Sequence, residues 1–169
     1  AETLRENGFS TLPQALISNL QPDGLQQIER FFRHHALQRA VVKPGIGGSS
    51  IGVFSVATPE EAYARTQEIF AKGLDTQALI EPFCTGKEFT VVVFENLKGE
   101  PVALMPTEVE LSYDDHQIFD YRKKYLPTNQ AAYHTPPRFS HDVVDHIRMQ
   151  AEQIFTLFGM RDFVRLDGW

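Results

Sequence analysis

Residues 40–52 read Ala40-Val41-Val42-Lys43-Pro44-Gly45-Ile46-Gly47-Gly48-Ser49-Ser50-Ile51-Gly52, and the interpretation of the fold starts from them. The short β-branched run before Pro44 predicts a strand, and residues 53–56 predict a strand that returns beside it. The glycines between them predict a loop, at residues 44–52, whose backbone can adopt positive φ and bring amides close to a phosphate. This hairpin-like unit indicates either a nucleotide site or an ordinary turn.

The loop matches neither of two common nucleotide motifs. No Lys-Ser/Thr pair follows its last glycine, as a Walker sequence requires, and Ser50 replaces the third glycine of a dinucleotide fingerprint. Lys43 favours the nucleotide interpretation, because a lysine in an otherwise β-branched strand is costly to bury unless an anion is its partner. The alternative is an edge lysine that extends its ammonium group into water.

Three helices are predicted from apolar spacing and from signals at their ends. The first spans residues 23–35. The second begins at Thr58, has Pro59 in its first turn and a Glu at the capping-box position, and runs to residue 72 before Gly73. The third is capped by Ser140 and ended by Gly159. The apolar stripe of this third helix contains Val143, Val144, Ile147, Ala151, Ile154 and Phe158.

Four further strands are predicted between and after the helices. They cover residues 78–81, 88–94, 101–108 and 163–167, and the turn at residues 96–99 makes the second and third antiparallel. Residues 112–127 are polar and predict an irregular loop. Strands mixed with helices, including a hairpin, predict an α+β or mixed α/β fold.

Two pairs of charged residues extend the candidate site. Glu81 ends one predicted strand and Glu88 opens the next, so their carboxylates could accept hydrogen bonds from an amine or from ribose hydroxyls. Arg165 and Asp167 lie two residues apart on the last strand and therefore face the same side of the sheet. A phosphate ligand beside a magnesium ligand would give this pattern, and so would a simple surface ion pair.

Composition narrows the class of protein. The 169 residues carry a net charge of −6, which disfavours a sequence-independent nucleic-acid binder and favours small-molecule partners. The single cysteine, Cys84, excludes an intramolecular disulfide and fits a reducing compartment. No apolar run is long enough to predict a membrane span. The chain does not begin with Met, and we expect it to be a piece of a longer protein.

Taken together, these segments resemble the D-alanine–D-alanine ligases of the ATP-grasp superfamily. The matching motifs, in order, are Val42-Lys43-Pro44 with the glycine-serine loop, Ile80-Glu81, Gly86-Lys87-Glu88-Phe89-Thr90-Val91, Phe119-Asp120-Tyr121, Lys124-Tyr125 and Arg165-Leu166-Asp167. Residues 121–128, 134–137 and 165–169 resemble in particular the form found in plant plastids and some bacteria. The resemblance covers nearly the whole chain. It implies a fragment of the ATP-grasp fold, with a central subdomain at residues 1–81 and an incomplete C-terminal subdomain at 82–169 that hold the nucleotide between them.

The resemblance also implies roles for individual residues. Those implied to bind the nucleotide are Lys43, the loop residues Gly48, Ser49 and Ser50, the adenine contacts Glu81, Phe83 and Cys84, the ribose ligand Glu88, and Lys124 at the terminal phosphate. Those implied to take part in catalysis are Arg165, Lys124, Ser49 and Tyr125, and Asp167 is the implied magnesium ligand.

The implied reaction forms D-alanyl-D-alanine for peptidoglycan through an acyl phosphate, with ATP, Mg²⁺ and D-alanine. The resemblance further implies a cytoplasmic protein, in a bacterial cytosol or a plastid stroma, whose complete form could be a homodimer. Because the family's amino-terminal domain and a later Glu-x-Asn magnesium pair are not among these residues, we expect the fragment alone to be inactive. Two alternatives stay open, namely a related carboxylate–amine ligase with another acceptor and a non-catalytic nucleotide-binding module.

Overall fold

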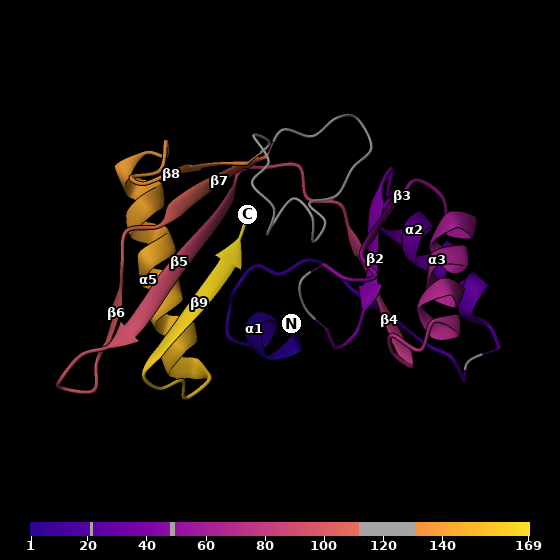
Figure 1. Cartoon of the computed structure of the whole chain (residues 1–169), viewed down its shortest axis with the longest axis horizontal. Coiled ribbons are helices and arrows are strands. Elements are labelled where there is room, and N and C mark those ends of the chain that lie inside the picture. Colours follow the sequence, from indigo (N-terminus) through magenta and orange to yellow (C-terminus); the bar gives the residue numbers. More distant parts are fainter. Residues whose placement is uncertain (21, 48–49, 112–130) are drawn as a thin grey trace. The chain divides into compact units, whose positions relative to one another are not determined.

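The computed structural model describes residues 1–20, 22–47, 50–111 and 131–169, which fold into helices and two antiparallel sheets (Figure 1). This arrangement confirms the predicted α+β class. The elements are α1 (Glu2–Glu6), β1 (Ala15–Ser18), α2 (Gly24–His34), β2 (Ala40–Pro44), β3 (Phe54–Val56), α3 (Pro59–Ala71), β4 (Gln77–Pro82), β5 (Glu88–Glu95), β6 (Pro101–Ala103), β7 (Thr107–Leu111), β8 (Ala131–His134), α5 (His141–Leu157) and β9 (Phe163–Gly168). The chain forms two compact units, with elements α1–β4 in unit 1 and elements β5–β9 in unit 2.

The sheet of unit 1 has the strand order β1-β4-β2-β3, and all its neighbouring strands are antiparallel. Its central strands pair so that Val42 lies opposite Ile80. Because side chains alternate across a strand, Ala40, Val42, Ala78 and Ile80 share one face, and each of the four is 0% exposed. The other face carries Lys43 and Glu81.

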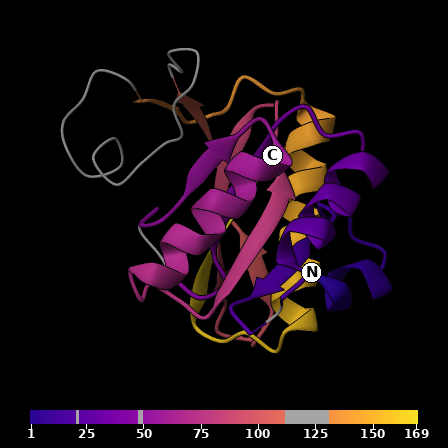
Figure 2. The ribbon, with the colours of Figure 1, turned by 90° about the vertical axis from the view of Figure 1, so that its right-hand side faces the viewer.

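Two helices cover the apolar face of this sheet, as Figure 2 shows with α3 in front. Helix α2 buries Ile28, Phe31 and Phe32, and α3 buries Ala62, Thr66 and Ile69. The hydroxyl of Thr66 donates to the Ala62 carbonyl at 2.9 Å, so its burial leaves no polar atom unsatisfied. The core of unit 1 therefore lies between this helix pair and one sheet face.

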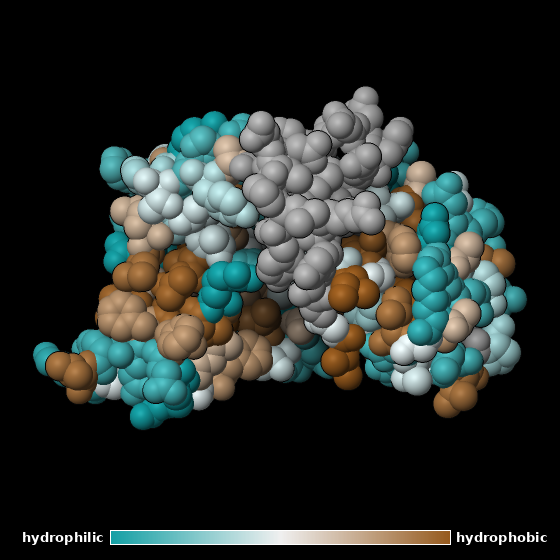
Figure 3. Space-filling view, viewed as in Figure 1, coloured by the Kyte–Doolittle hydropathy of each residue, from teal (hydrophilic) through white to brown (hydrophobic). Residues whose placement is uncertain are grey.

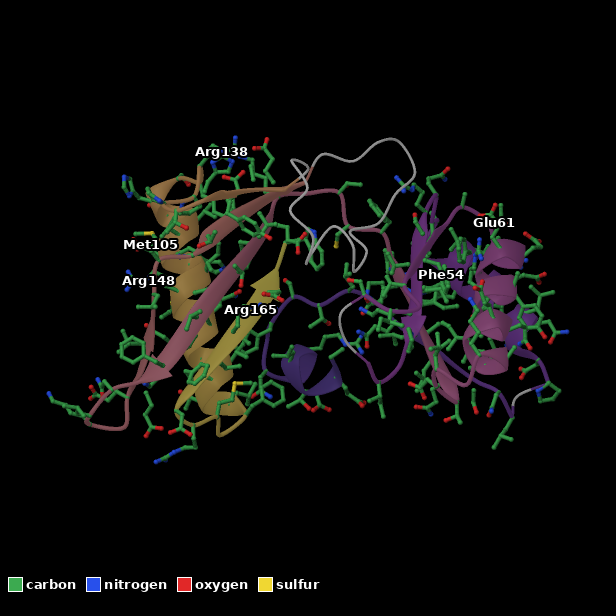
Figure 4. All side chains as sticks on the ribbon, in the orientation of Figure 1. Phe54, Glu61, Met105, Arg138, Arg148 and Arg165 are labelled. Atoms are coloured by element: carbon green, nitrogen blue, oxygen red, sulfur yellow. The ribbon has the colours of Figure 1, made fainter. Side chains whose placement is uncertain are left out.

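Local sequence signals set the ends of α3. Thr58 Oγ1 accepts a hydrogen bond from the Glu61 N–H at 3.2 Å, and the Glu61 carboxylate, labelled in Figure 4, accepts one from the Ala57 N–H at 2.8 Å. Gly73 follows the helix with φ +63°, a conformation that favours glycine. The predicted start and stop of this helix are confirmed.

The sheet of unit 2 is built around β5. Strands β6 and β7 pair with one edge of β5, β8 pairs with β7, and β9 pairs with the other edge of β5. Val91 and Val93 are 2% and 0% exposed and pack with Ala151 and Phe155 of helix α5. Val164 and Leu166 of β9 pack against the same core.

Among the described residues of unit 2, no helix packs on the opposite face of this sheet. Thr90, Arg165 and Asp167 lie on it, because they alternate with the residues that pack against α5. Further along, Phe94 is paired with Phe163, which is 75% exposed. Figure 3 shows hydrophobic residues in brown over the strands of unit 2 on the face turned to the viewer. This open face thus has a charged end and an apolar end.

The outer edge of β6 is closed by side chains from α5. The Ala103 N–H donates to Glu152 Oε1 at 2.9 Å, and Arg148 Nε donates to the Ala103 carbonyl at 3.0 Å. Both backbone groups of Ala103 that point away from β5 are therefore satisfied by the helix.

The predicted strand at residues 101–108 is wrong, because it is divided into β6 and β7. Between the pairs Val93–Ala103 and Thr90–Thr107, β5 has two residues while the other strand has the three residues 104–106. One extra residue interrupts the ladder as a bulge does, and Pro106 has no N–H to donate to it. Both strands nevertheless follow the same edge of β5.

Helix α5 begins and ends as predicted, with two corrections. Ser140 is its N-cap residue, but its hydroxyl makes no cap hydrogen bond; only its carbonyl accepts from the Val144 N–H, at 3.1 Å. The predicted stripe is displaced, because Phe155 is buried while Val143 and Phe158 are 46% and 47% exposed. The core of unit 2 thus contacts a face of the helix rotated from the one that spacing alone indicated.

Three short elements were not predicted, namely α1, β1 and β8. Each has five residues or fewer, which is too short for a periodic pattern. The predicted loop at residues 112–127 lies outside the described residues. Among the helices that the structure describes, none has the length and apolar character needed to cross a membrane.

Candidate functional site

The predicted site residues fall into three groups. Four of them, Gly48, Ser49, Lys124 and Tyr125, lie outside the described residues. Unit 1 contains Lys43, Ser50, Glu81, Phe83 and Cys84, and unit 2 contains Glu88, Arg165 and Asp167.

The centre of the unit 1 group is an ion pair between two neighbouring strands. Lys43 on β2 donates to Glu81 Oε2 on β4 at 2.5 Å. The register places Val41 opposite Glu81 and Lys43 opposite Leu79, so the two charged residues are diagonal neighbours on the face away from the helices. The Lys43 side chain is 35% exposed and that of Glu81 is 12% exposed. The strand lysine therefore has an anionic partner within unit 1, and both side chains end on the open face of the sheet.

Gln14 is a further member of this group that sequence reasoning missed. Its Nε2 donates to Glu81 Oε1 at 2.7 Å, so both oxygens of the Glu81 carboxylate accept a hydrogen bond from the protein. Gln14 lies 67 residues before Glu81, directly before β1, and no local pattern relates the two. The two donors fix the orientation of the carboxylate.

Phe83 and Cys84 follow β4. The guanidinium of Arg39 lies 4.1 Å from the centre of the Phe83 ring, and the Phe83 N–H donates to the Arg39 carbonyl at 3.1 Å. Burial, followed by the negative charge of Glu81, raises the pKa of the Cys84 thiol. A thiol with a raised pKa is a poor nucleophile, which fits a structural role for Cys84.

Ser50 lies at the end of the glycine-rich loop in an unusual backbone conformation. Its φ is +57°, which is uncommon for a residue with a side chain. Gly52, two residues later, has φ +72°. Two left-handed residues close together turn the chain sharply between the loop and β3.

The unit 2 group is built on two adjacent strands. Asp167 on β9 accepts a hydrogen bond from Thr90 Oγ1 of β5 at 2.8 Å, and the register pairs the two residues directly. Arg165 Nε lies 3.1 Å from Asp167 Oδ1, and its Nη2 donates to Oδ2 at 3.2 Å. The Arg165 side chain, labelled in Figure 4, is 67% exposed and that of Asp167 is 46% exposed. The predicted common orientation is confirmed, and the guanidinium retains a large surface that an anion could approach.

Glu88 lies at the start of β5, opposite Val109 of β7, and is half-buried. It is two residues before Thr90, so the alternation of the strand places both on the same face. Thr90 itself was missed by sequence reasoning as a site residue, because its contact is with a residue 77 positions away.

A buried carboxylate in unit 2 was also missed. Glu108 is 2% exposed and accepts hydrogen bonds from Arg138, at 2.8 Å from Nη2, 3.1 Å from Nε and 2.8 Å from the backbone N–H. Hydrogen bonds from the Arg138 side chain lower the pKa of Glu108 to about 2. Lys87 lies 3.4 Å from the same carboxylate, and Glu110 pairs with both Arg138 and His134. This cluster links β7, β8 and the segment before α5, in which Arg138 lies.

Metal binding would require acidic ligands. Within residues 1–20, 22–47, 50–111 and 131–169, no three His, Cys, Asp or Glu residues are grouped so that they could hold a metal ion. Asp167 is a single carboxylate of the kind that magnesium shares with phosphate oxygens. Within the described residues, Asp167 would therefore need phosphate oxygens or other ligands to complete a magnesium site.

Comparisons with known proteins assign the chain to a family. Residues 8–168 match the family model described as D-ala D-ala ligase C-terminus. The D-alanine–D-alanine ligase of Prosthecochloris aestuarii is 35% identical over 126 residues, which cover 75% of this chain and 33% of that protein. The chain spans between about a third and a half of the length of the curated relatives it matches.

Solved structures give the same fold. The VanG D-Ala:D-Ser ligase from Enterococcus faecalis superposes with a TM-score of 0.78 at 22% identity, over 98% of this chain and 45% of that one. A D-alanine–D-alanine ligase from Bacillus anthracis complexed with ATP superposes with a TM-score of 0.66 at 16% identity, over 98% and 47% of the two chains. These neighbours have the ATP-grasp fold, and so does this chain. Because the family model matches almost every residue, the chain belongs to the D-alanine–D-alanine ligase family, in the part of those proteins that the model describes as the C-terminus.

Proposed function

We propose that this chain is the ATP-binding part of a D-alanine–D-alanine ligase, which joins two D-alanine molecules for peptidoglycan synthesis. The observation that carries the proposal is the family match over residues 8–168. The position of the candidates that lie in strands supports it, because both sheets carry them on the face away from their helices; they are Lys43, Glu81, Glu88, Arg165 and Asp167. ATP suits this proposal, because the solved neighbour from B. anthracis is complexed with ATP.

The proposed reaction has two steps. The carboxylate of the first D-alanine attacks the γ-phosphorus of ATP, which breaks the bond to the β-phosphate oxygen and gives an acyl phosphate and ADP. The amine of the second D-alanine then attacks the acyl carbon, loses a proton, and displaces inorganic phosphate to form the peptide bond. Negative charge develops on oxygen in both steps, so catalysis depends on positioning and on cations and hydrogen-bond donors.

Unit 1 supplies the proposed contacts to the adenine and phosphates. Lys43, held by Glu81 at 2.5 Å, has an ammonium group that can also donate to a phosphate oxygen. Glu81 is fixed by Gln14 and Lys43 and is proposed to recognise the adenine with the backbone of Phe83 and Cys84. Ser50 and the loop residues Gly48 and Ser49 are proposed to close over the terminal phosphates.

Unit 2 supplies the proposed contacts to the ribose and to the reacting groups. Glu88 is proposed to bind the ribose hydroxyls. Arg165, with two-thirds of its side chain exposed, is proposed to neutralise the acyl phosphate and the tetrahedral intermediate. Lys124 is proposed to contact the terminal phosphate, and Tyr125 to close the loop against Ser49.

Magnesium is proposed as the metal cofactor, with Asp167 as one protein ligand. When bound, Mg²⁺ would neutralise charge on the ATP phosphates. Asp167 is held in place by Thr90 and Arg165, and this arrangement orients its oxygens before any ion arrives. A cytoplasmic location and a homodimer of the complete protein stay predictions.

A second candidate is a related ligase with another acceptor. It is favoured by the likeness to a protein that is named a D-Ala:D-Ser ligase, which shares the fold at a TM-score of 0.78. A non-catalytic nucleotide-binding module is the remaining alternative.

The test is phosphate release by the complete protein with ATP, magnesium and D-alanine, with the product identified by mass. Formation of D-alanyl-D-alanine that depends on D-alanine supports the proposal. A mixed product with D-serine or D-lactate in place of the second D-alanine supports the other acceptor. ATP binding without product from any of these compounds would favour the non-catalytic module and contradict the ligase.

A further inference from the structure

Asp75 connects the end of α3 to the start of the glycine-rich loop, although 29 residues separate it from Ile46. Its Oδ2 accepts a hydrogen bond from the Ile46 N–H at 2.6 Å. Its Oδ1 accepts from the N–H groups of Thr76 at 2.6 Å and Gln77 at 3.1 Å. The adjacent Gly45 N–H donates to the Gln77 carbonyl at 3.0 Å. One carboxylate thus joins the first residues of the loop to the turn before β4.

The other end of the loop, at Gly52, lies against Leu74, the residue before Asp75. A Cβ added to Gly52 would lie 2.9 Å from Leu74 Cδ1 and 3.1 Å from Pro44 Cγ. Gly52 also has φ +72°, so this position requires glycine for two reasons. The loop therefore begins against Asp75 and ends against Leu74, and residues 74–77 contact both of its ends.

Asp75 is suited to hold backbone amides. The hydrogen bond from Ile46, followed by bonds from Gln77, Thr76 and Gly45, lowers the pKa of its carboxyl group. An ionised carboxylate makes shorter and stronger hydrogen bonds than a neutral acceptor. Because one oxygen serves the loop and the other serves the turn, losing either interaction leaves the released N–H groups to water instead of to a fixed acceptor.

A phosphate-binding loop benefits from such an anchor. Backbone amides bind a phosphate tightly only if they already point at it, because ordering a loop during binding reduces affinity. A glycine-rich loop is costly to order, since each glycine has more conformational freedom than other residues. A fixed first turn reduces the number of residues that the ligand must order.

We propose that Asp75 is a positioning residue for nucleotide phosphates, acting through the backbone of Gly45 and Ile46. The inference rests on the proposed function, because it assigns the phosphates of ATP to this loop. Asp75 touches no substrate in this role. Its removal weakens the binding of phosphates and leaves the recognition of adenosine intact.

The test uses the complete protein with Asp75→Asn and Asp75→Ala. Asn can present only one oxygen, so either Ile46 or the turn before β4 loses its acceptor. We expect the KM for ATP and the Kd for ADP to rise about tenfold, which corresponds to loss of one charge-assisted hydrogen bond. The Kd for adenosine and the KM for D-alanine stay within twofold of the wild type. Amide hydrogen exchange becomes faster at Ile46 in Asp75→Ala, and at either Ile46 or the turn at Thr76 and Gln77 in Asp75→Asn.

Asp23→Asn is the matched control, because it makes the same change at a carboxylate in unit 1 that bonds Gln27 and Arg30. We expect this control to leave the KM values for ATP and D-alanine and the Kd values for ADP and adenosine unchanged. If Asp75→Ala does not fold, Gly52→Ala is the second variant, because it strains the other end of the loop. We expect it to raise the Kd for ADP and to leave the Kd for adenosine unchanged.

Two results would overturn the inference and leave the proposed function standing. Equal losses of ADP and adenosine affinity in the Asp75 variants would show a general structural role. Unchanged ADP affinity with faster exchange at Ile46 would show that the anchor does not serve the phosphates. A wild-type protein that binds neither ATP nor ADP would instead refute the proposed function and the inference with it.

Discussion

The two units of this chain share one arrangement of sheet and helix but differ in the residues that form their cores. In each, an antiparallel sheet packs one face against one or two helices and leaves candidate site residues on the other. Unit 1 has two helices over a core that includes Ile17, Ile28, Ile69 and Ile80, each 0% or 1% exposed. Unit 2, over its described residues, has one long helix, a smaller apolar cluster and the buried carboxylate of Glu108. Unit 1 is thus stabilised mainly by apolar burial, and unit 2 also depends on a charged cluster.

The largest expected effect tests the apolar core of unit 1. Ile80→Ala removes a side chain that is 0% exposed, and we expect it to lower the free energy of unfolding of the chain by about 4 kcal/mol, through lost burial and a cavity. Urea denaturation measures the change. Val143→Ala in unit 2, where the side chain is 46% exposed, is the control and should change it by less than about 0.5 kcal/mol. Similar losses in the two variants would contradict the comparison.

The next effect concerns the open face of unit 2. Arg165→Ala in the complete protein should lower kcat about 10²-fold, or about 3 kcal/mol, because it removes a cation at developing negative charge. The Kd for ATP should change less than threefold. Arg161→Ala is the control, since Arg161 is 78% exposed in its side chain and pairs with Glu95. Equal losses of turnover and ATP affinity would remove Arg165 from its proposed role.

The charged cluster of unit 2 is tested by pH. Arg138→Ala leaves the buried Glu108 carboxylate without its main partner and should cost about 2 kcal/mol of unfolding free energy at pH 7. In the wild type, the pKa of Glu108 is lowered from 4.5 to about 2 by Arg138, so its contribution is present above about pH 4.5 and is lost as pH falls toward 2.

Urea denaturation of the chain between pH 2 and pH 6 checks this dependence. Glu108→Gln should be less stable at pH 6 and should lose less stability on acidification than the wild type. Glu60→Gln, on the exposed surface of α3, is the control and should follow the wild-type curve. A Glu108→Gln variant with an unchanged acid dependence would argue against the cluster as its source.

The smallest effect compares the helix caps of the two units. Thr58→Ala should cost about 1 kcal/mol, because the Thr58 hydroxyl accepts the Glu61 N–H. Ser140→Ala should cost less than about 0.5 kcal/mol, because its hydroxyl makes no cap hydrogen bond. Thermal or urea denaturation of both variants gives the difference. A larger loss at Ser140 than at Thr58 would reverse this interpretation of the caps.

The sequence predicted those features that neighbouring residues determine. Helix α3 was predicted from its own capping residues, and the hairpin of β2 and β3 from Pro44 and the glycines. The common orientation of Arg165 and Asp167 followed from alternation along one strand. The extra residue between β6 and β7 was missed because it arises from the pairing with β5, although Pro106 was a local signal against one continuous strand.

The candidate site was predicted less completely, for the same reason. Lys43 and Glu81 were separate candidates, and only the register of β2 with β4 brings them together. Gln14, Thr90 and Asp75 were missed because their partners are 67, 77 and 29 residues away. Glu108 was only the last residue of a predicted strand, and its carboxylate pairs with Arg138, which is 30 residues later. The functional roles of all these residues stay predictions.

The side chains that satisfy Ala103 also affect the behaviour of the chain in concentrated solution. A strand at the margin of a sheet usually offers free N–H and C=O groups, to which another chain can add a strand of its own. On β6, Glu152 and Arg148 already occupy both groups of Ala103. With only three residues in β6, little unpaired backbone is left for an incoming strand. Helix α5 thus covers the core and also disfavours the addition of a strand from another chain at the edge of β6.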